Sequence, residues 1–235
     1  MTTYEVKLKG REEVAEGTMA FHFEKPTGFN FKSGQAVDLV LADAEGARHT
    51  FSMVSAPFES ELVIATRMRD SAFKRVLKTM KVGTAAKLEG PFGSLTLHNN
   101  RVRPAVFIAG GIGITPFMSI LRQATKDQLP QRLLLLYSNR RPEDAVFLSE
   151  LQYLEQQNKN FRLVATMTEM SKSSRAWEGE QGFINEDLVK RVGGDLATPI
   201  YYMAGPPAMV DAMRQMLNRA AINDDDIRSE EFYGY

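Results

Sequence analysis

The sequence contains no cysteine, and this absence removes several classes of chemistry at once. Disulfides, thiolate nucleophiles, cysteine zinc sites and cysteine-ligated iron–sulfur clusters all require that residue. Histidine is also scarce, because only His22, His49 and His98 are present. Their spacing does not suggest a metal site, so no metal centre is predicted.

An excess of charge of either sign is missing as well. The chain has 29 Lys and Arg against 29 Asp and Glu, a formal net charge of +0. Nucleic acids and anionic lipid surfaces select basic patches, so neither is expected as a partner. Hydrophobic residues at 43% and charged residues at 25% are ordinary values for a folded chain. The 235 residues allow one large domain or two small ones, and we expect a monomer.

Long hydrophobic runs are absent too. The longest uncharged stretch, residues 104–121, is interrupted by three glycines and two prolines and is followed at once by Arg122. This pattern predicts a buried strand, turn and helix rather than a membrane span. Residues 1–11 are polar and charged, which is unlike the apolar region of a signal peptide. We therefore expect a cytoplasmic protein with no membrane insertion.

The first hundred residues read as short strands separated by turns. Alternating or apolar segments occupy residues 4–8, 19–23, 36–41, 62–66 and 86–89, with Gly and Pro between them. This spacing predicts a small antiparallel barrel or sandwich. One helix interrupts it, because Phe73, Val76, Leu77 and Met80 recur at helical spacing. Ser71 is placed to cap that helix.

From about residue 103 the rhythm changes to strand, helix, strand, helix. Apolar strands are predicted at residues 105–109, 133–137, 162–167 and 200–204. Helices are expected to begin at an N-cap Thr115 followed by Pro116, at Pro142, after Asn185, and at the Pro206–Pro207 pair. The fold class is therefore an N-terminal antiparallel β-barrel, residues 1–100, followed by a doubly wound parallel α/β domain, residues 101–235.

A glycine-rich turn joins the first strand of the second half to its helix. Gly110, Gly111 and Gly113 precede Thr115. Glycines let a backbone approach a ligand closely, and a helix start offers N–H groups to a pyrophosphate. The alternative is a tight turn that binds nothing. The turn is not a G-x-G-x-x-G fingerprint.

The next strand ends in Ser138, Asn139, Arg140 and Arg141, with no acidic residue among them. An acid at this place would bind a ribose 2′-hydroxyl, whereas Arg and Ser suit a 2′-phosphate. NADPH is therefore favoured over NADH. The alternative is that the two arginines are solvated loop charges.

Five segments in order carry a family resemblance: HTFS at 49–52, GPFG at 90–93, GGIGITP at 110–116, AGPPAM at 204–209 and EEF at 230–232. Together they resemble the ferredoxin–NADP⁺ reductase superfamily over nearly the whole chain. The resemblance implies a flavin-binding barrel followed by a nicotinamide-binding domain. Each segment is weak evidence alone, and their common order makes the match specific.

In that family an Arg-x-Tyr-Ser motif holds the flavin. Here its aromatic position, which packs on the isoalloxazine, falls on Phe51, and its Ser, near flavin N5, falls on Ser52. Its Arg falls on His49, a departure that Arg67 or Arg69 would compensate. The implied flavin contacts are His49, Thr50, Phe51, Ser52, Ala65, Thr66, Arg67, Ser71, Ala72 and Phe73. The phosphate motif has Met68 where the family has Gly. FAD is favoured, with FMN possible.

For the nicotinamide, the family's Cys-Gly-Pro motif falls on Ala204, Gly205 and Pro206, so the Cys is absent. The resemblance implies that Phe232 covers the flavin face and that Glu230 assists electrostatically or in proton transfer. The alternative for Phe232 and Tyr235 is ordinary edge-strand packing. The implied nucleotide contacts are Gly110, Gly111, Gly113, Thr115, Ser138, Arg140, Arg141, Ala204, Gly205, Pro206, Met209 and Phe232, and the implied catalytic residues are Ser52, Glu230 and Phe232.

The resemblance implies a flavin-dependent oxidoreductase that moves hydride between NAD(P)H and FAD. Electrons then pass to or from an external partner: a ferredoxin, a flavodoxin, a partner subunit or a small molecule. One alternative is a flavin-binding electron-transfer or regulatory subunit with little nicotinamide turnover. A flavin-free dehydrogenase and a pure interaction module explain fewer of the motifs.

Overall fold

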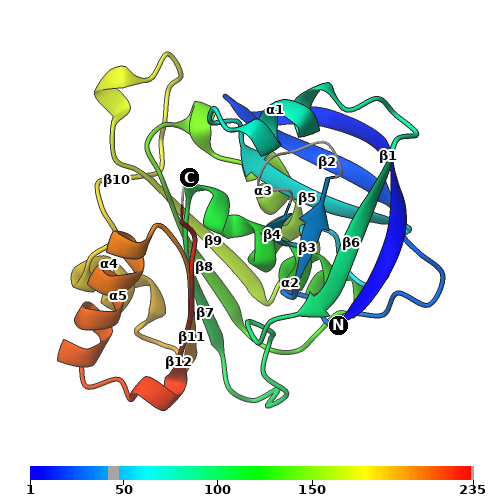
Figure 1. Cartoon of the computed structure of the whole chain (residues 1–235). Coiled ribbons are helices and arrows are strands. Elements are labelled where there is room, and N and C mark those ends of the chain that lie inside the picture. The colour runs from blue at the N-terminus through cyan, green and yellow to red at the C-terminus, as the bar shows by residue number, and fades with distance from the viewer. Residues whose placement is uncertain (42–47, 234–235) are drawn as a thin grey trace. The chain divides into compact units, whose positions relative to one another are not determined.

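A computed structural model describes residues 1–41 and 48–233 of the chain (Figure 1). It divides into two compact units. The first consists of Met1–Thr96 with Thr115–Gln123, and the second of Leu97–Ile114 with Ala124–Tyr235. The units therefore interleave along the chain. The predicted domain ranges, 1–100 and 101–235, stay predictions.

The first unit is built on an antiparallel sheet of six strands. They are β1 (Thr2–Ala15), β2 (Thr18–Glu24), β3 (Ala36–Val40), β4 (Arg48–Ser52), β5 (Glu61–Arg67) and β6 (Ala85–Phe92), in the order β4-β3-β6-β1-β2-β5. The two outermost strands in this order, β4 and β5, are also connected, because Met53, directly after β4, forms a β-bridge with Ile64 of β5. The Val54 N–H donates to the Val63 carbonyl at 2.8 Å beside that bridge. The predicted antiparallel barrel is confirmed.

Strand alternation fills the inside of this barrel. On β1, Val6 and Leu8 are buried while their neighbours along the strand are exposed. Phe21, Phe23 and Leu39 join them in one apolar core. Burial of such side chains is the main term that favours the folded barrel, at about 25 cal/mol per Å² of apolar surface removed from water.

The helix predicted in the barrel half is α1 (Ala72–Thr79). The Ser71 hydroxyl accepts a hydrogen bond from the Lys74 N–H at 3.2 Å, which makes Ser71 the expected N-cap. Phe73 and Leu77 are buried in the barrel core, four residues apart on one face of the helix. Sequence periodicity and cap therefore both predicted this element correctly.

The second unit contains a parallel sheet. Its strands are β7 (Ala105–Gly110), β8 (Leu133–Asn139), β9 (Phe161–Met167), β10 (Glu180–Gln181), β11 (Ile200–Gly205) and β12 (Ile227–Glu231), in the order β10-β9-β8-β7-β11-β12. Every neighbouring pair is parallel. The four predicted strands are present, β10 had not been predicted, and an edge strand near Phe232 had been considered only as an alternative. Both are short or half-exposed, so they lack a clear apolar signal.

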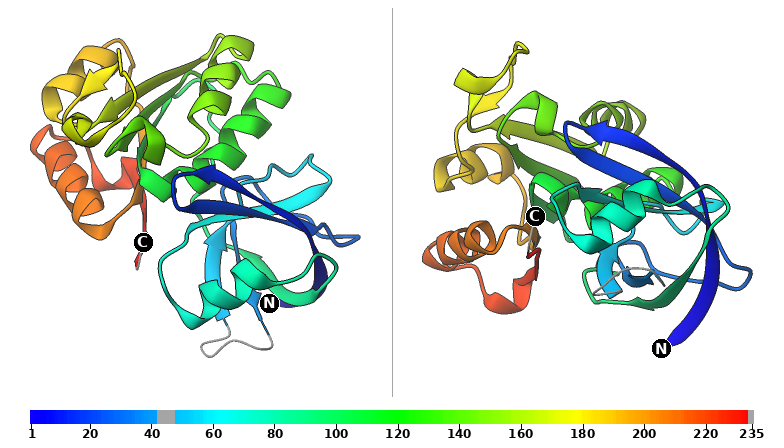
Figure 2. Two further views of the ribbon diagram at one scale, coloured as in Figure 1. Left: turned by 90° about the horizontal axis from the view of Figure 1, so that it is seen from above. Right: turned by 45° about the horizontal axis from the view of Figure 1, so that its top comes forward.

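Helices follow the strands of this sheet (Figure 2). They are α2 (Thr115–Lys126), α3 (Leu148–Gln157), α4 (Glu186–Gly193) and α5 (Pro207–Arg219), with 3₁₀ turns η1 (Gly111–Ile114), η2 (Pro142–Asp144), η3 (Met170–Lys172) and η4 (Asp224–Asp226). Apolar side chains of α4 and α5 share one core with β7, β8 and β11. As predicted, Asn185 caps α4, and its side-chain oxygen accepts from the Leu188 N–H at 2.9 Å.

Two predicted helix starts are wrong. Thr115 is not an N-cap, because the 3₁₀ turn η1 runs directly into α2 and Thr115 is the first residue of that helix. Pro142 opens only the turn η2, and α3 begins at Leu148. Between them Phe147 adopts a left-handed conformation with φ of 58°, which ends one helical turn before the next begins. Glycine is the usual sequence signal for a left-handed conformation, so a phenylalanine at this position could not be recognised from the sequence.

Among the described residues, none of the helices combines the length and the hydrophobicity that crossing a bilayer requires.

Candidate functional site

The strand register of the second unit aligns the motif residues at one edge of the sheet. Gly110 at the end of β7 lies opposite Ser138 of β8. On the other side of β7, Ala109 lies opposite Ala204 of β11, and Ala204 lies opposite Glu230 of β12. These positions are all at the carboxyl ends of parallel strands, where open α/β sheets bind their ligands. Four segments that are distant in sequence therefore meet at this edge.

The glycines at this edge are required by the chain's own packing. A Cβ on Gly113 would lie 2.2 Å from the Ala204 carbonyl oxygen, and one on Gly110 would lie 2.4 Å from the Met209 sulfur. Gly205 has φ of +156°, and its Cβ would lie 2.8 Å from the Met209 methyl carbon. Pro206 flanks the same contact, 3.1 Å from the position of a Gly110 Cβ. The ends of β7 and β11 thus lie so close together that only glycine, which has no Cβ, fits at these positions.

The glycine turn is also tied to the loop after β8. Gly111 has a positive φ of 53°, which suits glycine. The Tyr137 hydroxyl lies 3.2 Å from the Gly111 carbonyl oxygen and 3.1 Å from that of Val146, so it can donate to either. Thr115, which is buried, groups with the first unit rather than with this edge.

The two arginines after β8 have different surroundings. Arg141 donates from Nε and Nη2 to both carboxylate oxygens of Asp144, at 2.9 Å and 3.1 Å. Arg140 is more exposed, and its Nη2 lies 3.4 Å from Asp144 Oδ1. An acid therefore does stand near this edge, three residues beyond Arg141, and it neutralises the arginine that the sequence offered to a 2′-phosphate. Ser138 is half-buried, and Arg140 is the more accessible cation.

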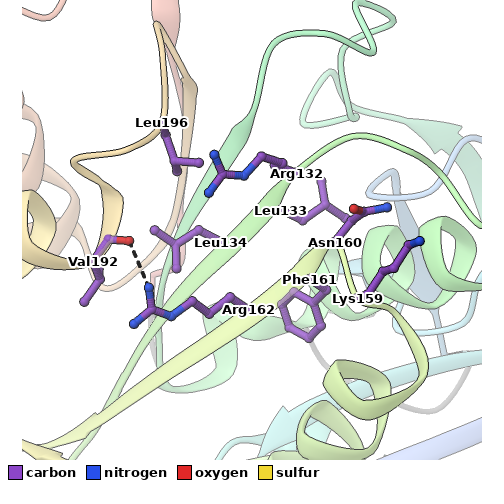
Figure 3. A pocket seen from close by; sticks show the side chains of 9 residues that line it. All are labelled: Arg132, Leu133, Leu134, Lys159, Asn160, Phe161, Arg162, Val192 and Leu196. Atoms are coloured by element: carbon purple, nitrogen blue, oxygen red, sulfur yellow. Dashed lines mark hydrogen bonds between the residues drawn. The ribbon is translucent and has the colours of Figure 1, made fainter.

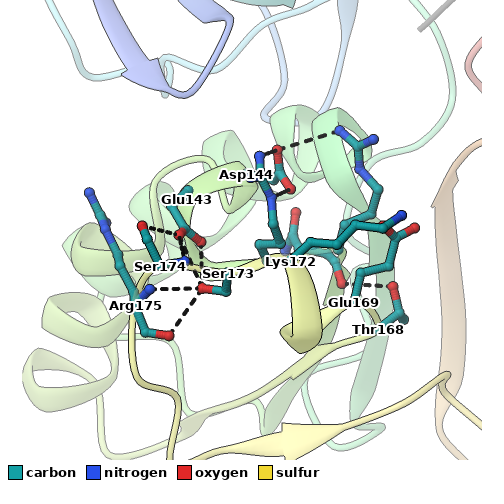
Figure 4. A network of polar contacts seen from close by, with 11 residues as sticks. Glu143, Asp144, Thr168, Glu169, Lys172, Ser173, Ser174 and Arg175 are labelled. Carbon is teal, nitrogen blue, oxygen red and sulfur yellow. Dashed lines mark hydrogen bonds and ion pairs between the residues drawn. The ribbon is translucent and has the colours of Figure 1, made fainter.

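A second carboxylate fastens the segment after β9 to the turn η2 (Figure 4). Glu143 accepts hydrogen bonds from the Ser173 hydroxyl at 2.9 Å and from the Ser174 N–H at 2.8 Å. Desolvation acts to raise the Glu143 pKa, but hydrogen bonds from its own backbone, from Ser174 and from Ser173 outweigh it and lower the pKa to about 2. The carboxylate is therefore ionised at neutral pH and holds residues 173–175 beside the Arg140 loop.

Glu230 and Phe232 lie on and just beyond the edge strand β12. Burial raises the pKa of the half-buried Glu230 carboxyl, and it has no hydrogen-bond or ion-pair partner among the residues that the structure describes. The Phe232 N–H donates to the Gly205 carbonyl at 2.9 Å, which continues the edge-strand pairing. Such backbone pairing agrees with the alternative interpretation of Phe232, in which the residue packs as part of an ordinary edge strand. Tyr235 lies outside the described residues.

In the first unit, β4 and α1 bring three aromatic rings together. The His49 and Phe73 ring centroids are 4.4 Å apart, and those of Phe51 and Phe73 are 5.9 Å apart. Burial, and next the charge of Lys74, lower the pKa of His49, so its ring is neutral at pH 7. Phe51 is only 4% exposed and belongs to the barrel core. Little of its ring is therefore available to stack on a flat ligand.

The other predicted flavin contacts of β4 and β5 differ in whether their side chains are available to a ligand. The Thr50 hydroxyl donates to Asp38, so it is engaged within the barrel. Ala65 and Thr66 are buried. The Ser52 side chain is mostly buried too, but its hydroxyl has no hydrogen-bond partner among the described residues. Ser52 and the exposed His49 are therefore the residues of β4 with polar groups left to offer.

The start of α1 gathers cations. Arg67 ends β5, Arg69 is exposed, and Lys74 in the first turn is only 7% exposed. Burial, and next the charge of Arg69, lower the Lys74 pKa. A helix N-terminus with nearby cations suits a phosphate group, so this corner fits the phosphates of a flavin nucleotide. Sequence reasoning missed Lys74, whose only signal was a lysine three residues after the Ser71 cap.

The phosphate end of a flavin thus fits the residues better than its ring does. Ser71, Ala72 and the cations near them are suitably placed for an anion. The buried ring of Phe51 does not present a stacking face. The placements of the other flavin residues stay predictions.

Comparison with known proteins identifies the second unit's domain. Residues 107–215 match the model of the oxidoreductase NAD-binding domain. The chain is 30% identical over 213 residues to the reductase component of propane 2-monooxygenase from Mycolicibacterium smegmatis, an alignment covering 88% of this chain and 61% of that protein. It is 26% identical over 223 residues to ferredoxin–NADP reductase B from Sorangium cellulosum, covering 91% and 90%.

Solved structures give the fold of the whole chain. A ferredoxin NADP⁺ reductase from Neisseria gonorrhoeae with bound FAD and NADP superposes with a TM-score of 0.82 at 22% identity, covering 97% of this chain and 98% of that one. The chain spans about three fifths of the length of the monooxygenase reductase component it matches. The chain therefore has the two-domain fold of ferredoxin–NADP⁺ reductases, and its residues 107–215 match the oxidoreductase NAD-binding domain.

Proposed function

We propose that the chain is an NAD(P)H-dependent flavoprotein reductase that exchanges electrons with an external acceptor. The observation that carries the proposal is the register of the parallel sheet, which aligns Gly110, Ser138, Ala204 and Glu230 at its carboxyl edge. That edge is where a dinucleotide binds in this class of fold. The matched NAD-binding domain, residues 107–215, covers β8, β11 and most of β7, and β12 lies beyond it.

At this edge the nicotinamide nucleotide would be held by the η1 turn and by the residues after β8. Gly111 and the N–H groups of η1 would receive the pyrophosphate, because a helical N-terminus favours an anion. Arg140 and Ser138 would face the adenosine end of the nucleotide. Ala204, Gly205 and Glu230 would border the nicotinamide. Glu230 would keep a proton more readily than an exposed carboxyl, since burial raises its pKa.

Flavin binding would use the start of α1 and the end of β4. Ser71, Arg69 and Lys74 would hold the phosphates, and the free hydroxyl of Ser52 would hydrogen-bond to the flavin ring. When bound, the flavin supplies the chemistry that links a two-electron hydride donor to one-electron acceptors. Phe51 would have to rotate out of the barrel core to stack on that ring, because only 4% of it is exposed.

We propose FAD rather than FMN as the flavin, and NADPH rather than NADH as the donor. The preference for NADPH rests on Arg140 and Ser138, since Asp144 already neutralises Arg141. A 2′-phosphate would add a charge-assisted hydrogen bond to Arg140 that NADH cannot make.

The acceptor is proposed to be a separate protein or a small molecule. The 235 residues hold no cysteine for an iron–sulfur cluster of their own. The matched relative from Mycolicibacterium smegmatis is the reductase component of a monooxygenase, so an oxygenase component joins ferredoxin, flavodoxin and small molecules as candidates. A monomeric state and a cytoplasmic location stay predictions.

One observation favours a second candidate, a flavin-binding electron-transfer or regulatory subunit with little nicotinamide turnover. Gly110 and Gly113 are explained by contacts with Met209 and Ala204, so a nucleotide is not needed to account for them. The two candidates share the barrel and differ in whether the carboxyl edge of the parallel sheet binds a nucleotide.

An anaerobic absorption titration separates them. The purified protein is loaded with FAD, and NADPH and NADH are added in parallel. We expect the flavin band to bleach with about one equivalent of nucleotide, and with NADPH more effectively than with NADH. A flavin that binds but is bleached by neither nucleotide would establish the electron-transfer subunit instead. Failure to bind FAD or FMN would overturn both.

A further inference from the structure

A pocket of about 250 Å³ opens at the amino ends of β8 and β9 (Figure 3). Its lining comes from the first residues of these strands, from the residues just before them, and from the end of α4 and the loop that follows it. The residues that line it are Arg132, Leu133, Leu134, Lys159, Asn160, Phe161, Arg162, Val192 and Leu196. All of them belong to the second unit.

Three of the lining side chains are cations, and none of the described lining residues is acidic. Arg162 donates from Nη1 to the Val192 carbonyl at 3.3 Å, which leaves its other N–H groups for further partners. Lys159 is exposed and has no hydrogen-bond or ion-pair partner among the residues described. Arg132 pairs with Asp195, just outside the lining. Three positive charges therefore face one negative charge.

This pocket is separate from the cofactor edge. Leu133 and Phe161 are the first residues of β8 and β9, whereas Ser138 lies near the carboxyl end of β8. At about 3.3 Å per residue, the two ends of β8 are roughly 20 Å apart. Dinucleotides bind at carboxyl ends in this class of fold, so the pocket is not explained by the proposed cofactor.

We propose that this pocket binds a small organic anion, in which a carboxylate or phosphate head meets Arg162, Lys159 and Arg132 and a compact apolar body packs against the partly exposed Leu196. Guanidinium groups match the two oxygens of such a head, and Leu196 gives the body an apolar contact. The volume is below that of a drug-sized site, so the body is limited to about one ring.

The test uses four probes on the full chain: benzoate, its neutral isostere benzamide, phenyl phosphate and inorganic phosphate. Binding is measured by isothermal titration and by shifts of the Asn160 and Phe161 amide resonances. Arg162→Gln and Lys159→Gln remove the head-group partners one at a time. Lys190→Gln is the matched control, because Lys190 is an exposed cation on α4 that pairs with Glu186 and does not line the pocket.

We expect benzoate or phenyl phosphate to bind at roughly millimolar concentrations and benzamide at least about tenfold more weakly. Each pocket variant should weaken binding about tenfold, and the control should leave it unchanged. The ratio of benzoate to phenyl phosphate affinity identifies the head group. Equal binding of benzoate and benzamide, equal binding of inorganic and phenyl phosphate, or binding unaffected by both pocket variants would each overturn the proposal. None of these outcomes bears on flavin reduction.

Discussion

Arg141 and Asp144 form a two-point ion pair, with Nε 2.9 Å from Oδ2 and Nη2 3.1 Å from Oδ1. The Asp144 side chain is only 4% exposed, so its charge depends on this partner. Arg140, one residue earlier, reaches the same carboxylate only at 3.4 Å and is 54% exposed. Two adjacent arginines thus have different tasks: Arg141 compensates a buried charge, and Arg140 remains accessible to a ligand.

Substituting Arg140 should change the preference for NADPH, whereas substituting Arg141 should change the stability of the fold. Arg140→Ala should weaken NADPH binding about tenfold and leave NADH binding nearly unchanged, because one charge-assisted hydrogen bond to the 2′-phosphate is lost. Arg141→Ala should instead lower the free energy of unfolding by about 2 kcal/mol, since it removes the two charge-assisted hydrogen bonds that Arg141 donates to the buried Asp144 carboxylate. Nucleotide titrations and denaturant unfolding measure the two effects. A loss of NADPH preference in Arg141→Ala but not in Arg140→Ala would contradict this assignment.

Gly113→Ala should disrupt the contact between the ends of β7 and β11. The new Cβ would lie 2.2 Å from the Ala204 carbonyl oxygen, a backbone atom that cannot rotate away. We expect the free energy of unfolding to fall by about 2–3 kcal/mol. Gly10→Ala is the control, because a Cβ there meets nothing within 4 Å. Equal stability of the two variants in urea unfolding would show that the close approach is not required.

Glu143→Gln should loosen residues 173–175 in a pH-dependent way. The folded-state pKa is depressed to about 2 from 4.5, so the carboxylate stabilises the fold above pH 4.5 and this effect is lost as the pH falls toward 2. Hydrogen exchange at the Ser174 amide should be faster in the variant at pH 7, and the difference should shrink in acid. Glu178→Gln, an exposed position in the same segment, should leave that amide unchanged.

Glu230→Gln should change the pH dependence of stability in the opposite direction. Burial raises the folded-state pKa of Glu230, so the protonated form is favoured in the fold and stability is lost as the pH rises through that pKa. The variant should therefore be more stable than the parent at pH 7 and about equally stable below pH 4.5. Thermal unfolding across this range is the measurement. A variant less stable at pH 7 would mean that the ionised carboxylate has a favourable partner.

Lys74→Met should reduce flavin retention while sparing the helix. Lys74 lies in the first turn of α1, is only 7% exposed, and has its pKa lowered by burial and by Arg69, so a bound phosphate would relieve both penalties. We expect the Kd for FAD to rise about tenfold. Lys78→Met, in the exposed last turn of the same helix, is the matched control. Equal FAD affinity in the two variants, by fluorescence titration, would remove Lys74 from the phosphate site.

Local patterns predicted most of the elements, because their causes are local. The spacing of Phe73 and Leu77 predicted α1, and the cap at Ser71 fixed its first residue. Apolar runs predicted the central strands β7, β8 and β11, which are buried along their whole or nearly whole length. The edge strand β12 was considered only as an alternative near Phe232, since half-exposed strands mix polar and apolar residues and depend on a neighbour for pairing.

By itself, the sequence determined the order of two architectures, the glycine turn before α2 and the absence of thiol chemistry, because composition and periodicity express local preferences. Tertiary structure decided what the candidate residues can do. It paired Arg141 with Asp144, buried Phe51 in the barrel core and placed Ala204 against Gly113. Burial and long-range contacts set the availability and charge of a side chain, and both arise only when distant segments pack together.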